Sequence, residues 1–137
     1  FDKAFQALNK IKNNNESLAP EIHNQIGQLF LTMKQFEQAE HSFRMAIRDR
    51  PDFSGYRINY GNFLFVVGRY REAIEQFKSA IQKNSNKQLA LEGLGGTYWQ
   101  MGEHKKAIAS FKEILRINPK DETALATLDF FQKNPET

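Results

Sequence analysis

The chain has 137 residues, of which 40% are hydrophobic, and it contains no cysteine. This length is enough for one domain with its own core, and the composition is neither that of a disordered chain nor that of a membrane span. The lack of cysteine excludes disulfides, thiolate zinc sites and cysteine nucleophiles. The formal net charge of +3 is modest and its basic residues are mixed with acids, whereas nucleic-acid binders usually gather basic residues into a stripe.

No apolar run approaches the roughly 20 residues of a transmembrane helix, and no charged leader followed by an apolar stretch opens the chain. We therefore expect neither a signal peptide nor membrane insertion from these residues. The sequence begins with Phe1, inside a helical pattern and without an initiating Met. We accordingly expect a fragment of a longer protein, and the compartment stays open.

Apolar residues recur at spacings of three and four along most of the chain, which is the period of amphipathic helices. The predicted helices cover residues 1–12, 20–33, 36–49, 54–67, 70–83, 88–101, 104–117 and 122–133. Pro20 suits a first helical turn, and Pro51 and Pro119 end helices because the residue before a proline leaves the helical region. Ser54 and Asp121 are predicted N-caps. No segment has the alternation of a strand.

Three residue types recur at one constant interval of 34 residues. They are the glycines Gly27, Gly61 and Gly95, the alanines Ala39, Ala73 and Ala107, and the phenylalanines Phe43, Phe77 and Phe111. A fixed period between 20 and 50 residues is typical of stacked-repeat proteins. At the three glycines we expect a second backbone to pass too close for a side chain. The phenylalanines are predicted to fill the space between units.

These positions resemble the tetratricopeptide repeat, whose pattern is W-x2-L-G-x2-Y, then A-x3-F, then P. The third unit matches as Leu91-x2-Leu94-Gly95-x2-Tyr98, Ala107-x3-Phe111 and Pro119. The second reads Arg57-x2-Tyr60-Gly61-x2-Leu64 and Ala73-x3-Phe77, with Ser85 in place of the proline. The first reads His23-x2-Ile26-Gly27-x2-Phe30, Ala39-x3-Phe43 and Pro51. The departures are the absent leading Trp, Ile114 in place of a small residue, and Lys34 at a turn that often has Gly.

The resemblance implies an all-α fold, a right-handed superhelical solenoid of antiparallel helix pairs forming a single domain over residues 1–137. Residues 1–19 would be the second helix of a preceding repeat. Three full repeats would follow at 20–53, 54–87 and 88–121, and then a capping helix and tail at 122–137. Asp129 stands where the close-approach glycine would be, and we expect it to face water at this end.

The resemblance also implies that the first helix of each pair lines a concave face, where a peptide or helix of another protein is held. Carried over position by position, this predicted groove comprises Asn24, Gln28, Leu31, Thr32, Ile58, Asn59, Asn62, Phe65, Val66, Glu92, Gly96, Trp99, Gln100 and Phe130. Amide side chains can donate and accept, and so hold an extended backbone, while Trp is a typical interface anchor. The alternative is that Trp99 and Phe65 only pack between neighbouring helices.

Co-chaperone domains of this family hold a C-terminal carboxylate with Lys, Asn and Arg side chains. Asn59 fits its place in that set, but the expected basic positions carry Asn24, Leu89 and Gly93. The sequence therefore argues against a carboxylate clamp.

No motif for catalysis, a metal or a cofactor emerges. His23, His41 and His104 occupy three different places in the repeat. The acidic pairs Glu37/Glu40 and Glu72/Glu75 lie near basic residues and indicate a solvated face with local ion pairs.

We therefore predict a non-enzymatic scaffold that binds a protein segment, with no cofactor and no small-molecule substrate. One alternative is a docking or self-association arm of a larger enzyme or envelope-assembly protein. Another is a nucleic-acid binder, whose affinity would fall steeply with salt. The sequence identifies neither the partner nor the oligomeric state.

Overall fold

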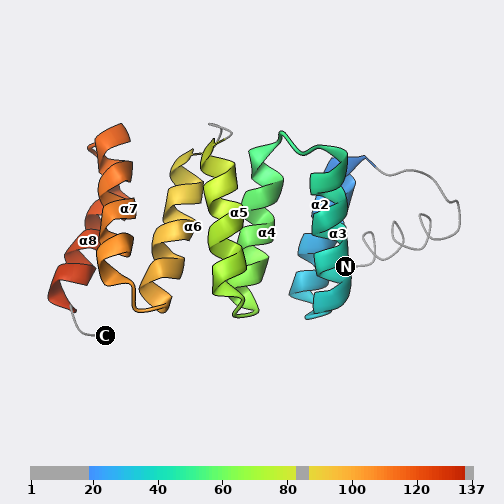
Figure 1. Ribbon diagram of the computed structural model, residues 1–137, viewed down its shortest axis with the longest axis horizontal. Helices are drawn as coiled ribbons and strands as arrows, with labels where there is room; N and C mark the ends of the chain where they lie inside the picture. Colours follow the sequence, from blue (N-terminus) through green and yellow to red (C-terminus); the bar gives the residue numbers. More distant parts are fainter. Residues whose placement is uncertain (1–18, 83–86, 135–137) are drawn as a thin grey trace, which may run out of the picture.

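The computed structural model describes residues 19–82 and 87–134, and these ranges contain helices and no strand (Figure 1). The helices are α2 (Pro20–Thr32), α3 (Phe36–Asp49), α4 (Ser54–Val66), α5 (Tyr70–Gln82), α6 (Lys87–Gln100), α7 (His104–Ile117) and α8 (Glu122–Lys133). Each bound lies within one residue of its prediction. The predicted helix at residues 1–12, and with it the preceding half-repeat, lies outside the described residues.

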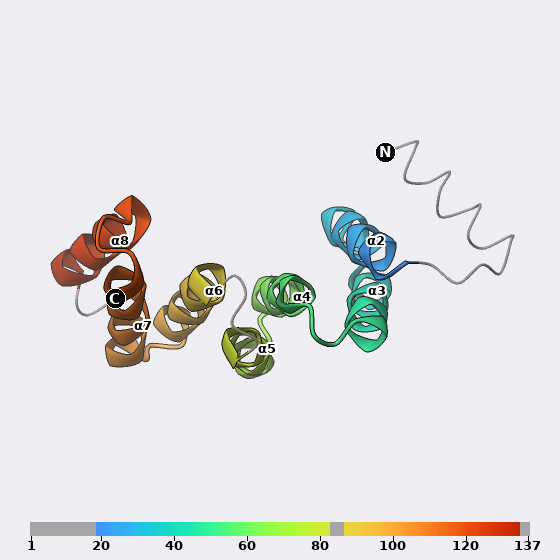
Figure 2. The ribbon, with the colours of Figure 1, turned by 90° about the horizontal axis from the view of Figure 1, so that it is seen from above.

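The helices form two rows along an arc, as the view from above shows (Figure 2). One row contains α2, α4, α6 and α8 and follows the concave side, while α3, α5 and α7 form the convex side. The chain is therefore an all-α solenoid of stacked antiparallel helix pairs, as predicted. Of the helices described, none is long and apolar enough to cross a membrane.

The recurring glycines make room for the recurring phenylalanines. A Cβ atom added at Gly61 would lie 2.7 Å from the ring of Phe77, and one added at Gly95 would lie 2.5 Å from the ring of Phe111. Our expectation of a second backbone at these points was wrong, because the nearest atoms belong to an aromatic ring of the second helix in the same pair. A Cβ at Gly93 would also lie 2.5 Å from Phe77. Phe77 therefore packs between two helix pairs, as predicted.

The turn inside each helix pair closes in the left-handed backbone region. Lys34 has φ 60°, Gly68 has φ 85° and Gly102 has φ 79°. The residue after each of these three donates its backbone N–H to the carbonyl five residues earlier in the sequence. Gln35, for example, donates to the Phe30 carbonyl at 2.9 Å. This hydrogen bond is typical of a Schellman motif. Glycine adopts this conformation without a steric penalty, whereas Lys34 does not.

The predicted helix starts were right in two cases and wrong in one. Pro20 is the first residue of α2, and the Asp121 carboxylate accepts a hydrogen bond from the Ala124 N–H at 2.8 Å. Ser54 is not the N-cap of α4, because the helix begins at Ser54 itself and Phe53 occupies the cap position. The Phe53 ring packs 4.6 Å from that of Tyr56, which holds the extended residue against the helix.

The capping helix α8 ends the described solenoid. At the position where the repeat pattern has its glycine, this helix carries Asp129. Asp129 is exposed and forms an ion pair with Lys133 at 3.0 Å. The charge faces water, as predicted, because no further helix packs on it within the described residues.

Candidate functional site

The polar part of the predicted groove joins two helices of the concave row. The Asn59 side-chain amide of α4 donates to the Asn24 side-chain oxygen of α2 at 3.1 Å. Asn24 is buried and Asn59 is half-buried. The Asn59 side-chain oxygen and the Asn24 side-chain nitrogen have no hydrogen-bond partner in the part of the chain that the structure describes. The pair therefore keeps the Asn59 oxygen as an acceptor and the Asn24 nitrogen as a donor for another molecule.

Several predicted groove residues are open to solvent. Gln28, Asn62 and Gln100 are exposed, and the apolar side chains of Val66 and Phe130 are 61% and 53% exposed. A Cβ added at Gly96 would meet no atom within 4 Å, so there is open space above this residue. Glu92 is half-buried.

Other predicted groove residues are used within the fold. Ile58 is buried in the core and Leu31 packs against it. The Thr32 hydroxyl donates to the Gln28 carbonyl of its own helix at 3.0 Å. Phe65 lies 5.5 Å from the ring of Tyr70 in the same helix pair. These side chains offer less to a partner than their position in the repeat suggests.

Trp99 packs between helices, as the alternative interpretation expected. Its ring stacks on Phe131 of α8 at a centroid distance of 3.8 Å, with 7° between the planes. On its other flank lies His104 of α7 at 4.1 Å. The exposed ring of Phe130 approaches its edge at 6.4 Å. Trp99 thus fixes α8, and Phe130 is the aromatic side chain beside it that remains open.

A network of charged and polar side chains links α3 to the next helix pair. The Tyr60 hydroxyl donates to the Glu40 carboxylate at 2.7 Å and accepts from Arg44 at 3.1 Å. Arg69 forms ion pairs with Glu40 at 2.8 Å and with Glu72 at 2.6 Å. Desolvation raises the pKa of Tyr60, and its bond to Glu40 adds to the effect. The predicted local ion pairs of Glu40 and Glu72 are confirmed.

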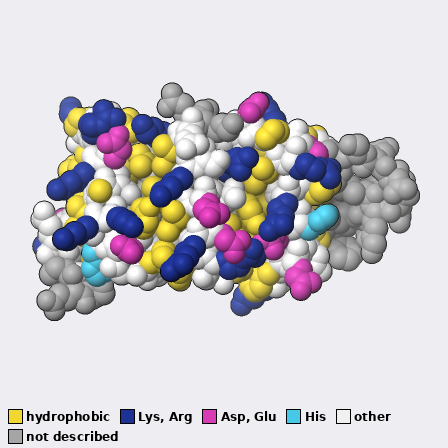
Figure 3. All heavy atoms as spheres, in the orientation of Figure 1, with side chains coloured by type: hydrophobic (Ala, Val, Ile, Leu, Met, Phe, Trp, Pro, Cys, Tyr) yellow, Lys and Arg dark blue, Asp and Glu magenta, His cyan; other side chains and the backbone are white. Residues whose placement is uncertain are grey.

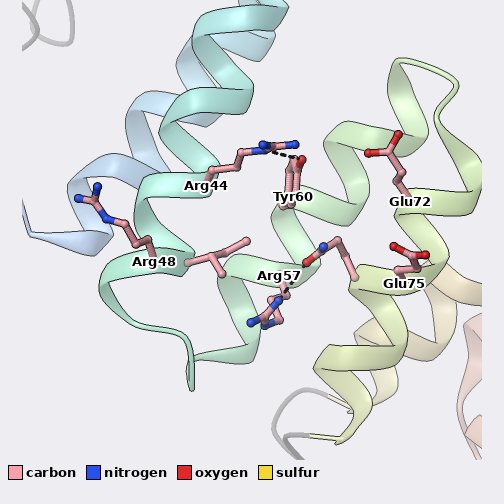
Figure 4. Close-up of a pocket in the computed structure, with 8 residues that line it drawn as sticks. Arg44, Arg48, Arg57, Tyr60, Glu72 and Glu75 are labelled. Atoms are coloured by element: carbon pink, nitrogen blue, oxygen red, sulfur yellow. Dashed lines mark hydrogen bonds between the residues drawn. The ribbon is translucent and has the colours of Figure 1, made fainter.

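The convex face carries a second feature, which the sequence did not reveal. Lys and Arg side chains are spread over this face with acidic side chains among them (Figure 3). A crevice of about 420 Å³ opens between α3 and α5, above α4 (Figure 4). We call it the convex crevice, and it is lined by Arg44, Ile47, Arg48, Arg57, Tyr60, Glu72, Glu75 and Gln76.

Across residues 19–82 and 87–134, no group of three or more His, Asp or Glu side chains is arranged to hold a metal ion. His23 of α2 lies 3.9 Å from Asp49. Burial lowers the pKa of His23 even though the Asp49 carboxylate acts in the opposite direction.

Antiparallel helix pairs stacked in an arc, with glycine and phenylalanine in contact in each pair, define a helical-repeat solenoid. Two family models described as tetratricopeptide repeat match the chain, one over residues 24–82 and the other over residues 64–128. Together they take in residues 24–128. The chain belongs to the tetratricopeptide repeat family, which is generally a non-enzymatic fold for protein interaction.

Individual proteins resemble this chain at low sequence identity, one in sequence and two in structure. The human Protein O-mannosyl-transferase TMTC2 is 27% identical over 66 residues, which are 48% of this chain and 8% of that protein. The crystal structure of MamA superposes with a TM-score of 0.75 at 21% identity, over 96% of this chain and 75% of that one. The first repeat domain of Spaghetti (RPAP3), bound to the HSP90 peptide SRMEEVD, superposes with a TM-score of 0.76 at 13% identity. That match covers 89% of this chain and 97% of the other.

Proposed function

We propose that the concave groove holds a segment of a partner protein and that the chain acts as a non-catalytic scaffold or assembly module. The observation that carries this proposal is that amide groups with unused hydrogen-bonding capacity and exposed apolar side chains belong to helices of the concave row. The amides belong to Asn24, Asn59 and Asn62, and Val66 and Phe130 are the exposed apolar residues. Exposed apolar side chains that are rimmed by polar residues are typical of a protein interaction surface.

The amide pair would hold the backbone of the bound segment. A peptide group presents one donor and one acceptor, and the Asn24–Asn59 pair has one of each to offer. Asn62 lies one turn further along α4 and is exposed, so it extends the same polar track. Backbone contacts of this kind give affinity without strict sequence preference.

The apolar contacts would select the side chains of the segment. Phe130 stands beside the Trp99–Phe131 stack, so its ring is a preorganised surface for an apolar residue. At the positions where co-chaperone domains place basic residues, this chain has Asn24, Leu89 and Gly93. The peptide bound to RPAP3 supports peptide binding by this fold, but we expect the segment here to present its backbone and an apolar side chain rather than a terminal carboxylate.

The proposal is tested by affinity capture from native extract with the wild-type chain and the variant Asn62→Ala/Phe130→Ala. Both residues are exposed, so the helical spectrum and the melting temperature should stay unchanged, and both are checked first. Trp99 is left intact because it packs on Phe131. A protein retained by the wild type and lost by the variant supports the groove.

The matched control is Lys78→Ala/Lys112→Ala, with one exposed residue on each of α5 and α7 of the convex row. This variant should capture the same protein as the wild type. Loss of capture by the control, with retention by the groove variant, would overturn the proposal.

A further inference from the structure

The convex crevice has two walls of opposite charge. Arg44 and Arg48 of α3 form one wall, and Glu72 and Glu75 of α5 form the other (Figure 4). Arg57 and Tyr60 rise from α4 between them. In the described ranges, no ion pair joins the arginines of α3 to the acids of α5. Arg44 pairs with Glu40, and Arg48 pairs with its neighbour Asp49. Glu72 pairs with Arg69, so Glu75 is the unpaired acid of the α5 wall within the same ranges.

Hydrogen-bonding capacity is left unused on both walls and on the floor. The Arg48 side chain is 66% exposed and bonds only to Asp49 among the described residues. Glu75 is exposed and has no hydrogen bond or ion pair within the same part of the chain. Arg57 donates to the Gln76 side-chain oxygen at 3.3 Å, but its Nε is buried and has no acceptor there. A buried donor without an acceptor is unfavourable, and a bound segment would supply an acceptor only if the Arg57 side chain turned toward the crevice.

We propose that the convex crevice binds an extended protein segment in which acidic and basic side chains alternate. In an extended chain, successive side chains point to opposite sides. A segment lying between α3 and α5 would therefore direct its acids toward Arg44 and Arg48, and its bases toward Glu72 and Glu75. The apolar side chain of Ile47 and the ring of Tyr60 would lie under its backbone.

Charge complementarity selects this occupant over a polyanion. A phosphate backbone would gain the arginine wall but would bring its charge against Glu72 and Glu75. An acidic peptide meets the same repulsion, and a basic peptide meets it at the arginines. Only a segment with both signs on opposite sides satisfies both walls.

The convex crevice is separate from the concave groove, since it opens between α3 and α5 of the outer row. Its binding would leave the groove free, and the chain would be able to hold two segments at once. The two proposals do not depend on each other.

The test is a titration of the isotope-labelled full chain, followed by amide chemical shifts, with two synthetic octapeptides. One alternates Glu and Lys, and the other has four Glu followed by four Lys. Both are acetylated and amidated, so composition and net charge are identical and only the pattern differs. The alternating peptide should shift amides of α3 and α5 and should bind at least fivefold more tightly than the block peptide at low salt. Because exposed charges are screened by salt, the preference should shrink at high ionic strength.

Single substitutions assign the two walls. Arg48→Gln and Glu75→Gln should each weaken binding of the alternating peptide at least threefold. Arg48→Glu should weaken binding of the alternating peptide more than Arg48→Gln does, because it places an acidic side chain beside Arg44 on the α3 wall. The matched control is Arg116→Gln on α7, since Arg116 stands two repeat periods after Arg48 but does not line the crevice. This control should bind like the wild type.

Three results would overturn the proposal. They are equal affinity for the two octapeptides, shifts confined to α2, α4 and α6, and no shifts at millimolar peptide. Binding of an octaglutamate probe in preference to both would instead indicate a site for acidic segments.

Discussion

At both ends of the described solenoid aromatic side chains join neighbouring helices, but different contacts accompany them. Between α3 and the following helix pair, Phe43 packs on Phe63, and beside this contact a polar network joins Glu40 to Tyr60, Arg44 and Arg69. Between α6–α7 and α8, the contact is an aromatic stack in which Trp99 lies flat on Phe131. The helices themselves are spaced by the same 34-residue repeat at both ends.

This difference shows that the repeat pattern specifies the pairing of helices and leaves the junction between pairs free to vary. An aromatic stack is held by burial, which has little directional demand. A network that shares one carboxylate among several donors depends on geometry. Its contribution to stability falls most when the shared carboxylate is removed. The predictions below separate these two kinds of junction.

The largest effect should come from Phe131→Ala at the aromatic junction. Phe131 is buried and contacts both Trp99 and Phe111. Its truncation should lower the free energy of unfolding by about 3–5 kcal/mol, as for other buried Phe→Ala changes, and should move Trp99 emission to longer wavelength. The neighbouring Phe130→Ala is the control, since Phe130 is 53% exposed and should cost roughly 0.5 kcal/mol. If urea unfolding gave the two variants equal losses of free energy, Phe131 would not be the residue that holds the aromatic junction.

Phe77→Ala in the middle of the solenoid should cost a similar amount, on the order of 3–5 kcal/mol. Phe77 lies between Gly61 and Gly93 of successive helix pairs, so its loss should uncouple them rather than detach one end. Hydrogen exchange should then report faster opening on both sides of the cavity. Faster exchange in α8 alone would argue against this role.

Glu40→Gln should break the polar network with a smaller effect of about 1.5–3 kcal/mol, the range for hydrogen bonds to charged groups. A double-mutant cycle with Tyr60→Phe isolates the contact of 2.7 Å between the two side chains. We expect a coupling energy of about 0.5–3 kcal/mol. Additive losses would show that the two residues act independently.

The turn of the first helix pair should be the strained one. Lys34 takes φ 60° where the other pairs have Gly68 and Gly102. Lys34→Gly removes roughly 1–2 kcal/mol of steric strain but adds flexibility to the unfolded chain, so the net gain should be about 0.5–1 kcal/mol. Gly68→Ala should lose a comparable amount, because its site is open and only the backbone angle opposes a side chain. A melting temperature that falls in Lys34→Gly would disprove the strain.

The smallest effect is the pH dependence contributed by His23. Burial holds the pKa of His23 below its ordinary value of 6.5. His23 therefore binds a proton more readily in the unfolded chain than in the folded one. Stability from this residue is therefore present above pH 6.5 and is lost as the pH falls through the lowered pKa. Urea unfolding at pH 7.5 and pH 5 should show a smaller difference for His23→Gln than for the wild type. An unchanged difference would remove His23 as the cause.

Most of the fold could be predicted because glycine, alanine and phenylalanine recur together at one period. The contact of Gly61 with Phe77 was within reach of the same observation, since the two types repeat at a constant separation, but periodicity alone does not distinguish a ring from a backbone. The predicted groove was less secure. Ile58 and Asn59 are adjacent in the sequence, yet Ile58 is in the core and Asn59 reaches Asn24.

The convex crevice could not be predicted from the sequence. Arg48, Arg57 and Glu75 belong to three helices and occupy unrelated places in the repeat, so no spacing rule connects them. The partner of Trp99 is a similar case, because Phe131 lies in the capping helix where the repeat pattern ends. Both features depend on how successive helix pairs stack.

The central claim is that the partner lies on the concave face, and photo-crosslinking from single positions tests it most directly. A photoreactive phenylalanine analogue is placed at exposed Asn62 of α4 or at exposed Lys78 of α5, and each protein is irradiated in native extract. The account predicts a crosslink to one protein from position 62, lost in the presence of excess wild-type chain, and none to that protein from position 78. A competed crosslink from position 78 alone would place the partner on the convex face and contradict the account.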